Sequence, residues 1–165
     1  MRRHIITATV AVLLVAAPAA AAQAPSAADT AKSACHAEKH GMGTQVFKKT
    51  YAAKSTAKAM AACIAKAVPA AEEAAKNAAK ACKDERAADP DAFAMKYGGN
   101  KNKRNALGKC ISQTVQETTD ATTEERVNAA QTCKAQRKDD KAGFEAAWGT
   151  RRNAFGKCVS ATAKA

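Results

Sequence analysis

The sequence predicts an all-α protein made of three disulfide-stapled helical repeats that follow a signal peptide. Three observations support this prediction: a cysteine-containing segment recurs along the chain, the good helix formers alanine, lysine and glutamate dominate, and there are six cysteines. Of the 165 residues, 45 are alanine, and from residue 25 onward only 12 are Leu, Ile, Val or Phe. Because so few large apolar side chains cannot fill an ordinary core, covalent staples must supply part of the stability.

Residues 1–24 have the layout of a signal peptide. Arg2 and Arg3 supply the positive start, residues 5–17 are apolar, and cleavage sites of the A-x-A form end at Ala22 and Ala24. No second apolar segment of that kind follows, so we expect no transmembrane segment in the mature chain. The protein is therefore predicted to be secreted, either extracellular or in the cell envelope.

The rest of the chain repeats itself. Cys82–Ser112 matches Cys133–Ser160 closely, ending in Arg-Asn-Ala-Leu-Gly-Lys-Cys-Ile-Ser in one copy and Arg-Asn-Ala-Phe-Gly-Lys-Cys-Val-Ser in the other. A more divergent copy covers Cys35–Ala65. We therefore divide the chain into a signal peptide (1–24), a divergent repeat 1 (25–68), repeat 2 (69–119) and repeat 3 (120–165).

Each repeat is predicted to hold a long helix with the first cysteine, a short helix with Phe and Tyr or Trp, and a closing helix with the second cysteine. Ser26 and Asp89, which precedes a proline, indicate helix starts, and Thr122-x-x-Glu125 reads as a capping box. Pro69 either opens a helix or kinks one. Repeats 2 and 3 are each expected to have a small core, formed by Phe93, Tyr97, Leu107 and Ile111 and by Phe144, Trp148, Phe155 and Val159.

Six cysteines in an exported protein indicate a disulfide framework, and no C-x-x-C motif suggests metal or redox chemistry. Two cysteines per repeat make pairing within repeats the simplest scheme: Cys35–Cys63, Cys82–Cys110 and Cys133–Cys158. An alternative joins Cys110 to Cys133 across the connection between repeats 2 and 3. A bond that closes a loop of about 28 residues adds roughly 3 kcal/mol in the chain-entropy model.

The pattern Cys-x-x-x-Arg…Phe…Tyr-Gly…Lys-Arg-Asn-Ala-Leu-Gly-Lys-Cys-Ile-Ser resembles a repeat of exported, alanine-rich actinobacterial proteins of uncharacterised function. The resemblance covers Cys82–Ser112 and Cys133–Ser160 well and Cys35–Ala65 weakly. It implies export and a cysteine-paired helical repeat, and it implies no activity.

No residue set points to an enzyme, a cofactor or a metal. His36 and His40 have the i, i+4 spacing of a metal pair but lack a third strong ligand, so we interpret them as solvated side chains. No nucleophile motif is present. We therefore predict a non-enzymatic protein without catalytic, cofactor-binding or metal-binding residues.

The net charge is the remaining signal, at +12 for the chain and +10 once Arg2 and Arg3 are removed. Two basic clusters stand where the closing helices of repeats 2 and 3 should begin, and an anion at a helix N-terminus is favoured by the helix dipole. We therefore predict anion binding by Lys101, Lys103, Arg104, Arg151 and Arg152.

These features favour a secreted cationic repeat protein that binds anionic polymers or surfaces of the cell envelope. Specific nucleic-acid recognition is disfavoured because aromatic residues are few and the compartment is wrong. The alternative is a cationic membrane-active or toxin-like protein, although such helices need a broad apolar face and these offer mainly alanine.

Overall fold

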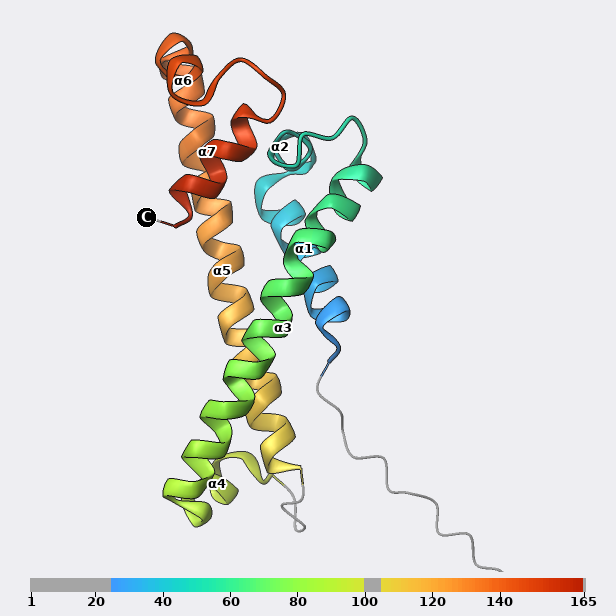
Figure 1. The fold of residues 1–165 in the computed structure, drawn as a ribbon, viewed down its shortest axis with the longest axis vertical. Coiled ribbons are helices and arrows are strands. Elements are labelled where there is room, and N and C mark those ends of the chain that lie inside the picture. Colours follow the sequence, from blue (N-terminus) through green and yellow to red (C-terminus); the bar gives the residue numbers. More distant parts are fainter. Residues whose placement is uncertain (1–24, 100–104, 165) are drawn as a thin grey trace, which may run out of the picture.

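A computed structural model describes residues 25–99 and 105–164 of the chain (Figure 1). Within these residues it contains seven helices and no strand, which confirms the predicted all-α class. The helices are α1 (Ala27–Met42), α2 (Thr44–Thr50), α3 (Thr56–Ala88), α4 (Pro90–Tyr97), α5 (Ala106–Asp139), α6 (Lys141–Trp148) and α7 (Ala154–Thr162). The predicted signal peptide (1–24) lies outside the described residues.

Each repeat is closed by its own disulfide, as predicted. The Cα atoms of the paired cysteines lie 5.9, 6.0 and 6.1 Å apart, in the order Cys35–Cys63, Cys82–Cys110 and Cys133–Cys158. All six cysteines are buried. The alternative bond between Cys110 and Cys133 is therefore wrong, and each staple joins a first helix to the closing helix of the same repeat.

Neighbouring repeats are joined by continuous helices. Helix α3 runs through Pro69 and α5 runs through Thr122, so the closing helix of one repeat is also the first helix of the next. The predicted capping box at Thr122 is wrong, because its hydroxyl donates to the carbonyl of Thr118, 2.9 Å away, inside α5. Residues 118–123 are mostly threonine and aspartate, which are weak helix formers, so it is the packing of α5 against α1 and α3 that keeps the helix continuous here.

Helix α4 starts after Asp89, as the sequence indicates, and α6 starts after the equivalent residue of repeat 3, Asp140. The Asp89 carboxylate accepts a hydrogen bond from the Ala92 amide at 2.9 Å, and Asp140 accepts one from the Gly143 amide at 2.8 Å. Ser26 caps α1 in the same way. A side chain at this position satisfies an N–H group that has no partner within the helix. These caps place α4 and α6 at equivalent positions in repeats 2 and 3.

Repeat 2 has a core of its own, whereas repeats 1 and 3 share one. In repeat 2, Phe93 and Tyr97 are buried and Leu107 and Ile111 pack against them, as predicted. The core expected for repeat 3 alone instead merges with that of repeat 1, and it includes Met42, Phe47, Phe144, Phe155 and Val159, with Trp148 packed against them. Repeat 2 occupies the α4 end of the elongated molecule, and α2, α6 and α7 gather at the other end (Figure 1).

Two contacts hold repeats 1 and 3 together. The first is between α1, which also packs against α3, and α5, and the second is between α2 and α7. Gly156 allows the second contact, because a Cβ atom there would collide with the carbonyl oxygen of Thr50.

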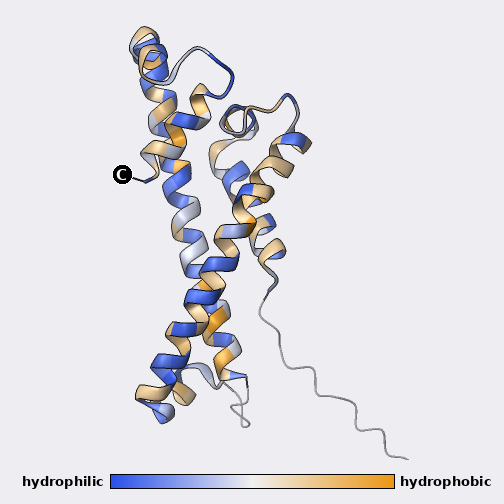
Figure 2. Cartoon of the chain, viewed as in Figure 1, coloured by the Kyte–Doolittle hydropathy of each residue, from blue (hydrophilic) through white to orange (hydrophobic). Residues whose placement is uncertain are grey.

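The long helices alternate hydrophobic and hydrophilic turns (Figure 2). No helix in the two described segments combines the length and the apolar character needed to cross a membrane.

Candidate functional site

The predicted anion-binding residues are only partly within the described structure. Lys101, Lys103 and Arg104 lie outside the described residues. Arg151 and Arg152 are exposed in the loop that connects α6 to α7, just before Asn153, the N-cap residue of α7. The side chain of Asn153 makes no capping hydrogen bond. The structure therefore places one of the two predicted basic clusters directly before a helix start.

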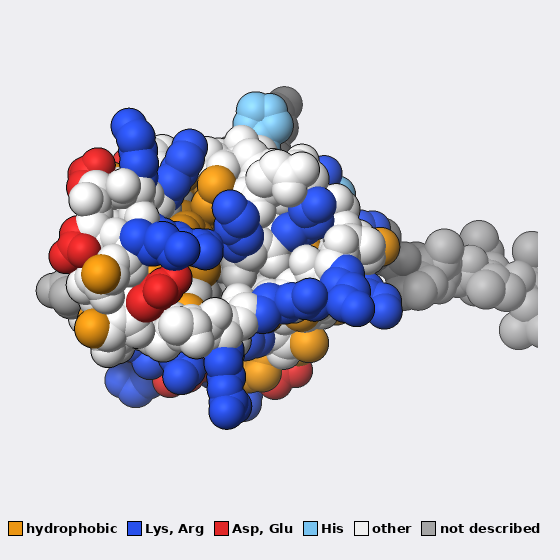
Figure 3. Space-filling view, turned by 90° about the horizontal axis from the view of Figure 1, so that it is seen from above, with side chains coloured by type: hydrophobic (Ala, Val, Ile, Leu, Met, Phe, Trp, Pro, Cys, Tyr) orange, Lys and Arg blue, Asp and Glu red, His pale blue; other side chains and the backbone are white. Residues whose placement is uncertain are grey.

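The fold adds two further cations to this cluster. Arg151 and Arg152 line a hollow of about 260 Å³ together with Lys49 of α2 and Arg137 of α5. We call this set of four cations the basic hollow. At the α2, α6 and α7 end of the molecule, Lys and Arg side chains gather around an apolar recess (Figure 3). Three segments that are distant in sequence thus contribute positive charge to one surface.

The charge of the basic hollow is largely uncompensated. None of its four cations forms a salt bridge with a described residue. The acidic lining residue, Glu145, is paired with Lys141 at 3.7 Å. Helix α5 extends the positive surface into a neighbouring hollow with Lys134 and Lys138, which share a helical face with Arg137. An anion approaching this end meets several free donors.

Sequence reasoning missed Lys49 and Arg137 as site residues. Arg137 carried a signal, because it stands four residues after the first cysteine of repeat 3, as Arg86 does in repeat 2. Lys49 carried none. It reaches the site only because repeat 1 packs against repeat 3, which no local pattern predicts.

A second polar cluster lies between repeats 1 and 3, and we call it the interrepeat network. The Tyr51 hydroxyl donates to Glu38 Oε2 at 2.6 Å, while Arg126 donates from Nε to Glu38 Oε1 at 2.6 Å and from Nη2 to the Tyr51 oxygen at 2.8 Å. The side chain of Glu38 is 6% exposed and that of Arg126 is 21% exposed. Glu38 is thus a buried carboxylate whose charge is balanced by an arginine 88 residues away in the sequence.

The network changes the ionisation of its members. Burial, followed by the negative charge of Glu38, holds the pKa of Tyr51 well above its usual value. Burial disfavours the charged form of Arg126, but the electrostatic interactions with Glu38 and Tyr51 and the hydrogen bonds to them together outweigh this effect and raise the arginine pKa. The structure therefore contains a neutral phenol beside a carboxylate–guanidinium pair.

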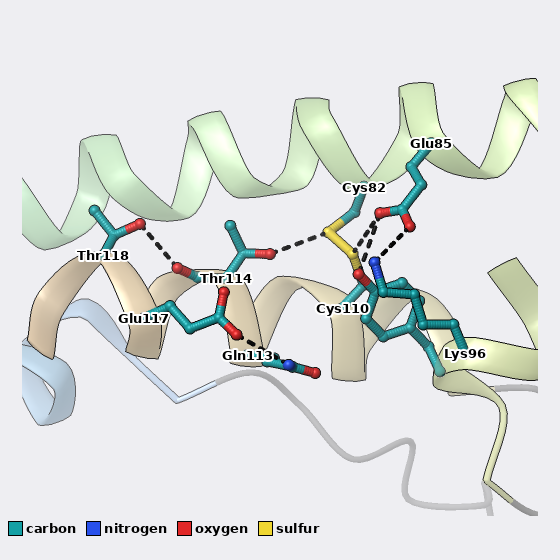
Figure 4. The surroundings of a disulfide bond; sticks show 9 residues. Cys82, Glu85, Lys96, Cys110, Gln113, Thr114, Glu117 and Thr118 are labelled. Carbon is teal, nitrogen blue, oxygen red and sulfur yellow. Dashed lines mark hydrogen bonds and ion pairs between the residues drawn. A yellow bond between two sulfur atoms is a disulfide. The ribbon is translucent and has the colours of Figure 1, made fainter. Parts of the chain in front are cut away.

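Repeat 2 has the same tyrosine–carboxylate pair near its surface. The Tyr97 hydroxyl donates to Glu85 Oε2 at 3.2 Å, and Lys96 donates to Glu85 Oε1 at 2.9 Å (Figure 4). The hydrogen bond from Lys96 lowers the pKa of Glu85. The cation here comes from within repeat 2, whereas Arg126 comes to repeat 1 from the distant α5.

A repeated position could have revealed these carboxylates. Glu38, Glu85 and Gln136 each stand three residues after the first cysteine of their repeat. Their aromatic partners in repeats 1 and 2 are tyrosines, and Trp148 occupies that position in repeat 3. This repeated position is the signal from which an acid–tyrosine pair in repeats 1 and 2, and its loss in repeat 3, could have been inferred.

Within the described segments, no group of three or more His, Cys, Asp or Glu side chains could hold a metal ion. His36 and His40 are both exposed on α1.

Comparisons of the chain with protein-family models, with curated proteins and with solved structures found no match. Inference about function therefore rests on the geometry of the chain's own residues.

Proposed function

We propose that this protein is a secreted, non-enzymatic cationic repeat protein that binds an anionic polymer or surface of the cell envelope. The observation that carries the proposal is the basic hollow, in which Lys49, Arg137, Arg151 and Arg152 converge without salt-bridge partners among the described residues. Unpaired cations on one surface attract polyanions and speed their association.

A polymer suits this surface better than a small anion does. All four cations of the basic hollow are exposed, and an exposed charge contributes little binding free energy by itself. The positive surface also continues along α5 through Lys134 and Lys138. A polyanion can contact many such charges at once and release its bound counterions, which gives affinity that falls steeply with salt.

Secretion is supported by the cysteine chemistry. Three disulfides in a chain of this size fit an oxidising compartment. The signal-peptide layout of residues 1–24 and the resemblance to exported alanine-rich proteins point the same way.

Membrane disruption is the competing function for the same charge. It is disfavoured by the surface, because Met95 is the single strongly exposed large hydrophobic side chain among the described residues, at 73% exposure. Surface-active helices instead bury a broad apolar face in the lipid.

The decisive experiment compares capture by isolated cell envelopes at several salt concentrations. A variant with glutamine at Lys49, Arg137, Arg151 and Arg152 should be captured several-fold more weakly at low salt and should fold normally. The matched control removes the same charge outside the basic hollow, by Lys32→Gln, Lys76→Gln, Lys83→Gln and Lys109→Gln. The control should bind nearly as well as the unmodified protein.

Three results would count against the proposal. Capture that does not weaken as salt rises would refute the electrostatic mechanism. Equal losses in the two quadruple variants would show that net charge, and not the basic hollow, governs binding. Dye release from anionic lipid vesicles at low protein concentration would favour the membrane-active function instead.

A further inference from the structure

A second cavity lies at the junction of α1, α3 and α5, away from the basic hollow. It has a volume of about 170 Å³. Its floor is buried and includes Ala31, Cys63 and Ala71, whereas Lys66 and Thr122 on its rim are exposed. The cavity therefore opens to solvent and has mainly apolar walls, and we call it the interhelical cavity.

Three helices line this cavity, and α3 contributes a longer stretch than α1 and α5. The lining residues span 30–38 on α1, 63–74 on α3 and 118–126 on α5. The stretch of α3 from Lys66 to Ala74 has the same length as the α5 span, about 12 Å at the helical rise. Helix α3 runs antiparallel to the other two (Figure 1). The charged lining residues are Glu38, Lys66 and Arg126. Lys66 and Arg126 are equally far along α3 and α5 from the Cys82–Cys110 disulfide and therefore lie level with each other, and Glu38 joins them through its salt bridge with Arg126. We call this level the charged end. From there toward Ala74 and Thr118, alanine and threonine line the facing walls of α3 and α5.

Three of the four threonine hydroxyls on the α5 wall are satisfied by their own helix. The hydroxyls of Thr118, Thr119 and Thr122 each donate to the carbonyl four residues earlier on α5. Their protons are therefore not available to a ligand. This leaves the length of the cavity suited to a hydrocarbon chain.

The charged end has hydrogen-bond donors that have no partner among the described residues. Arg126 uses Nε and Nη2 for the interrepeat network, and its Nη1 makes no hydrogen bond to a described residue. Lys66 forms no salt bridge within the described segments. Because Glu38 is already neutralised by Arg126, the lysine leaves this end with a net positive charge. A carboxylate is the group that pairs with such donors.

We infer that the interhelical cavity binds a free medium-chain carboxylate, with its alkyl tail between α3 and α5 and its carboxylate beside Arg126 and Lys66. An extended chain advances about 1.2 Å per bond, so a cavity of about 12 Å accepts roughly eight to ten carbons. Acyl chains of bilayer lipids must span half of a hydrocarbon core of about 30 Å and would overrun the cavity. The free acid is therefore the preferred ligand. This site is independent of the proposed polymer binding.

The first test is a series of ligands that differ in chain length and in charge. Their binding to the full, disulfide-bonded chain is measured by calorimetry and by amide chemical shifts. Octanoate should bind saturably, with a dissociation constant of ~0.1–1 mM, and should shift the amides around Ala71. Each methylene removed should weaken binding about fourfold, and the gain should stop beyond about ten carbons. Octylammonium, with the same tail and the opposite charge, should not bind at this site.

Two variants with matched controls locate the ligand. Ala74→Leu fills the end of the cavity far from the charges and should weaken octanoate binding about tenfold, whereas Ala65→Leu on the exposed face of α3 should not. Lys66→Gln should weaken binding about threefold, and Lys76→Gln outside the cavity should leave it unchanged.

The inference is overturned if octanoate shows no saturable binding, or if octylammonium binds equally well at the same amides. It is also overturned if affinity keeps rising beyond twelve carbons, since the cavity would then not limit the chain. Equal effects of Ala74→Leu and Ala65→Leu would place the ligand elsewhere. None of these outcomes bears on capture by cell envelopes, which depends on the basic hollow.

Discussion

Replacing Arg126 with methionine should destabilise the protein far more than the loss of a surface charge does. Arg126 is the salt-bridge partner of Glu38, whose side chain is only 6% exposed. Without it, a buried carboxylate and its tyrosine partner are left without the balancing positive charge. Removing one member of a buried ion pair typically costs about 3–5 kcal/mol. We therefore expect a loss of that size in the free energy of unfolding.

The measurement is urea denaturation with all disulfides intact, in which unfolding is monitored by far-UV circular dichroism. The matched control is Lys96→Met, which removes the cation beside Glu85 in repeat 2, where the two side chains are 59% and 41% exposed. Its effect should be much smaller because water screens the remaining carboxylate.

A double variant isolates the cause. Glu38→Gln combined with Arg126→Met removes both charges and should recover most of the stability lost in the single variant. Glutamine already occupies the equivalent position in repeat 3, at Gln136. If Arg126→Met costs no more than Lys96→Met, or if the double variant recovers nothing, the loss does not come from an uncompensated buried charge.

Three further predictions follow from the same structure. Replacing Cys82 and Cys110 with alanine should cost about 3 kcal/mol and should raise amide exchange in α4 before other helices, because repeat 2 has only a small separate core. Because the pKa of Tyr51 is raised in the folded protein, its stabilising contribution is complete below the ordinary phenol pKa of about 10 and is lost as the pH rises further. Between about pH 9 and pH 11, the Tyr51→Phe variant should therefore lose less thermal stability than the unmodified protein does. Gly156→Ala should lower the unfolding free energy by about 1–3 kcal/mol, because the added Cβ collides with the Thr50 carbonyl and separates α7 from α2; unchanged thermal unfolding would contradict this contact.

The sequence was sufficient for the parts of the fold that depend on local signals. Pairing of the cysteines within repeats was the simplest scheme that the repeat allowed, and the start of α4 followed from Asp89. The core of repeat 2 followed from apolar residues that are close in sequence. Each of these features depends on contacts within one repeat.

The packing between repeats was not predictable in the same way. Thr122 has the pattern of a helix start, and residues 118–123 are mostly threonine and aspartate, which are weak helix formers, yet packing against α1 and α3 carries α5 through it. Arg126 belongs to no matched position of the repeats, and only the tertiary fold brings it to Glu38. The basic hollow was likewise half predicted: Arg151 and Arg152 were identified from sequence, whereas Lys49 joins them across the contact between repeats 1 and 3.

The comparison of the three repeats explains how related units come to pack differently. Repeats 1 and 2 both carry a tyrosine bonded to a carboxylate, but repeat 2 neutralises Glu85 with its own Lys96 near the surface. In repeat 1 the cation is Arg126 of α5, so its carboxylate is satisfied only when repeats 1 and 3 are packed together.

This dependence gives the interrepeat network a role in specificity. An arrangement in which α5 slipped by one turn would leave Glu38 buried without a cation, at a cost that apolar packing of alanine cannot offset. Repeat 3 has glutamine and tryptophan at the corresponding positions, so it has no carboxylate there that would compete with Glu38 for Arg126. We therefore expect the charge on Glu38 to select one register of α5 against α1, and the basic hollow at the far end of α5 forms only in that register.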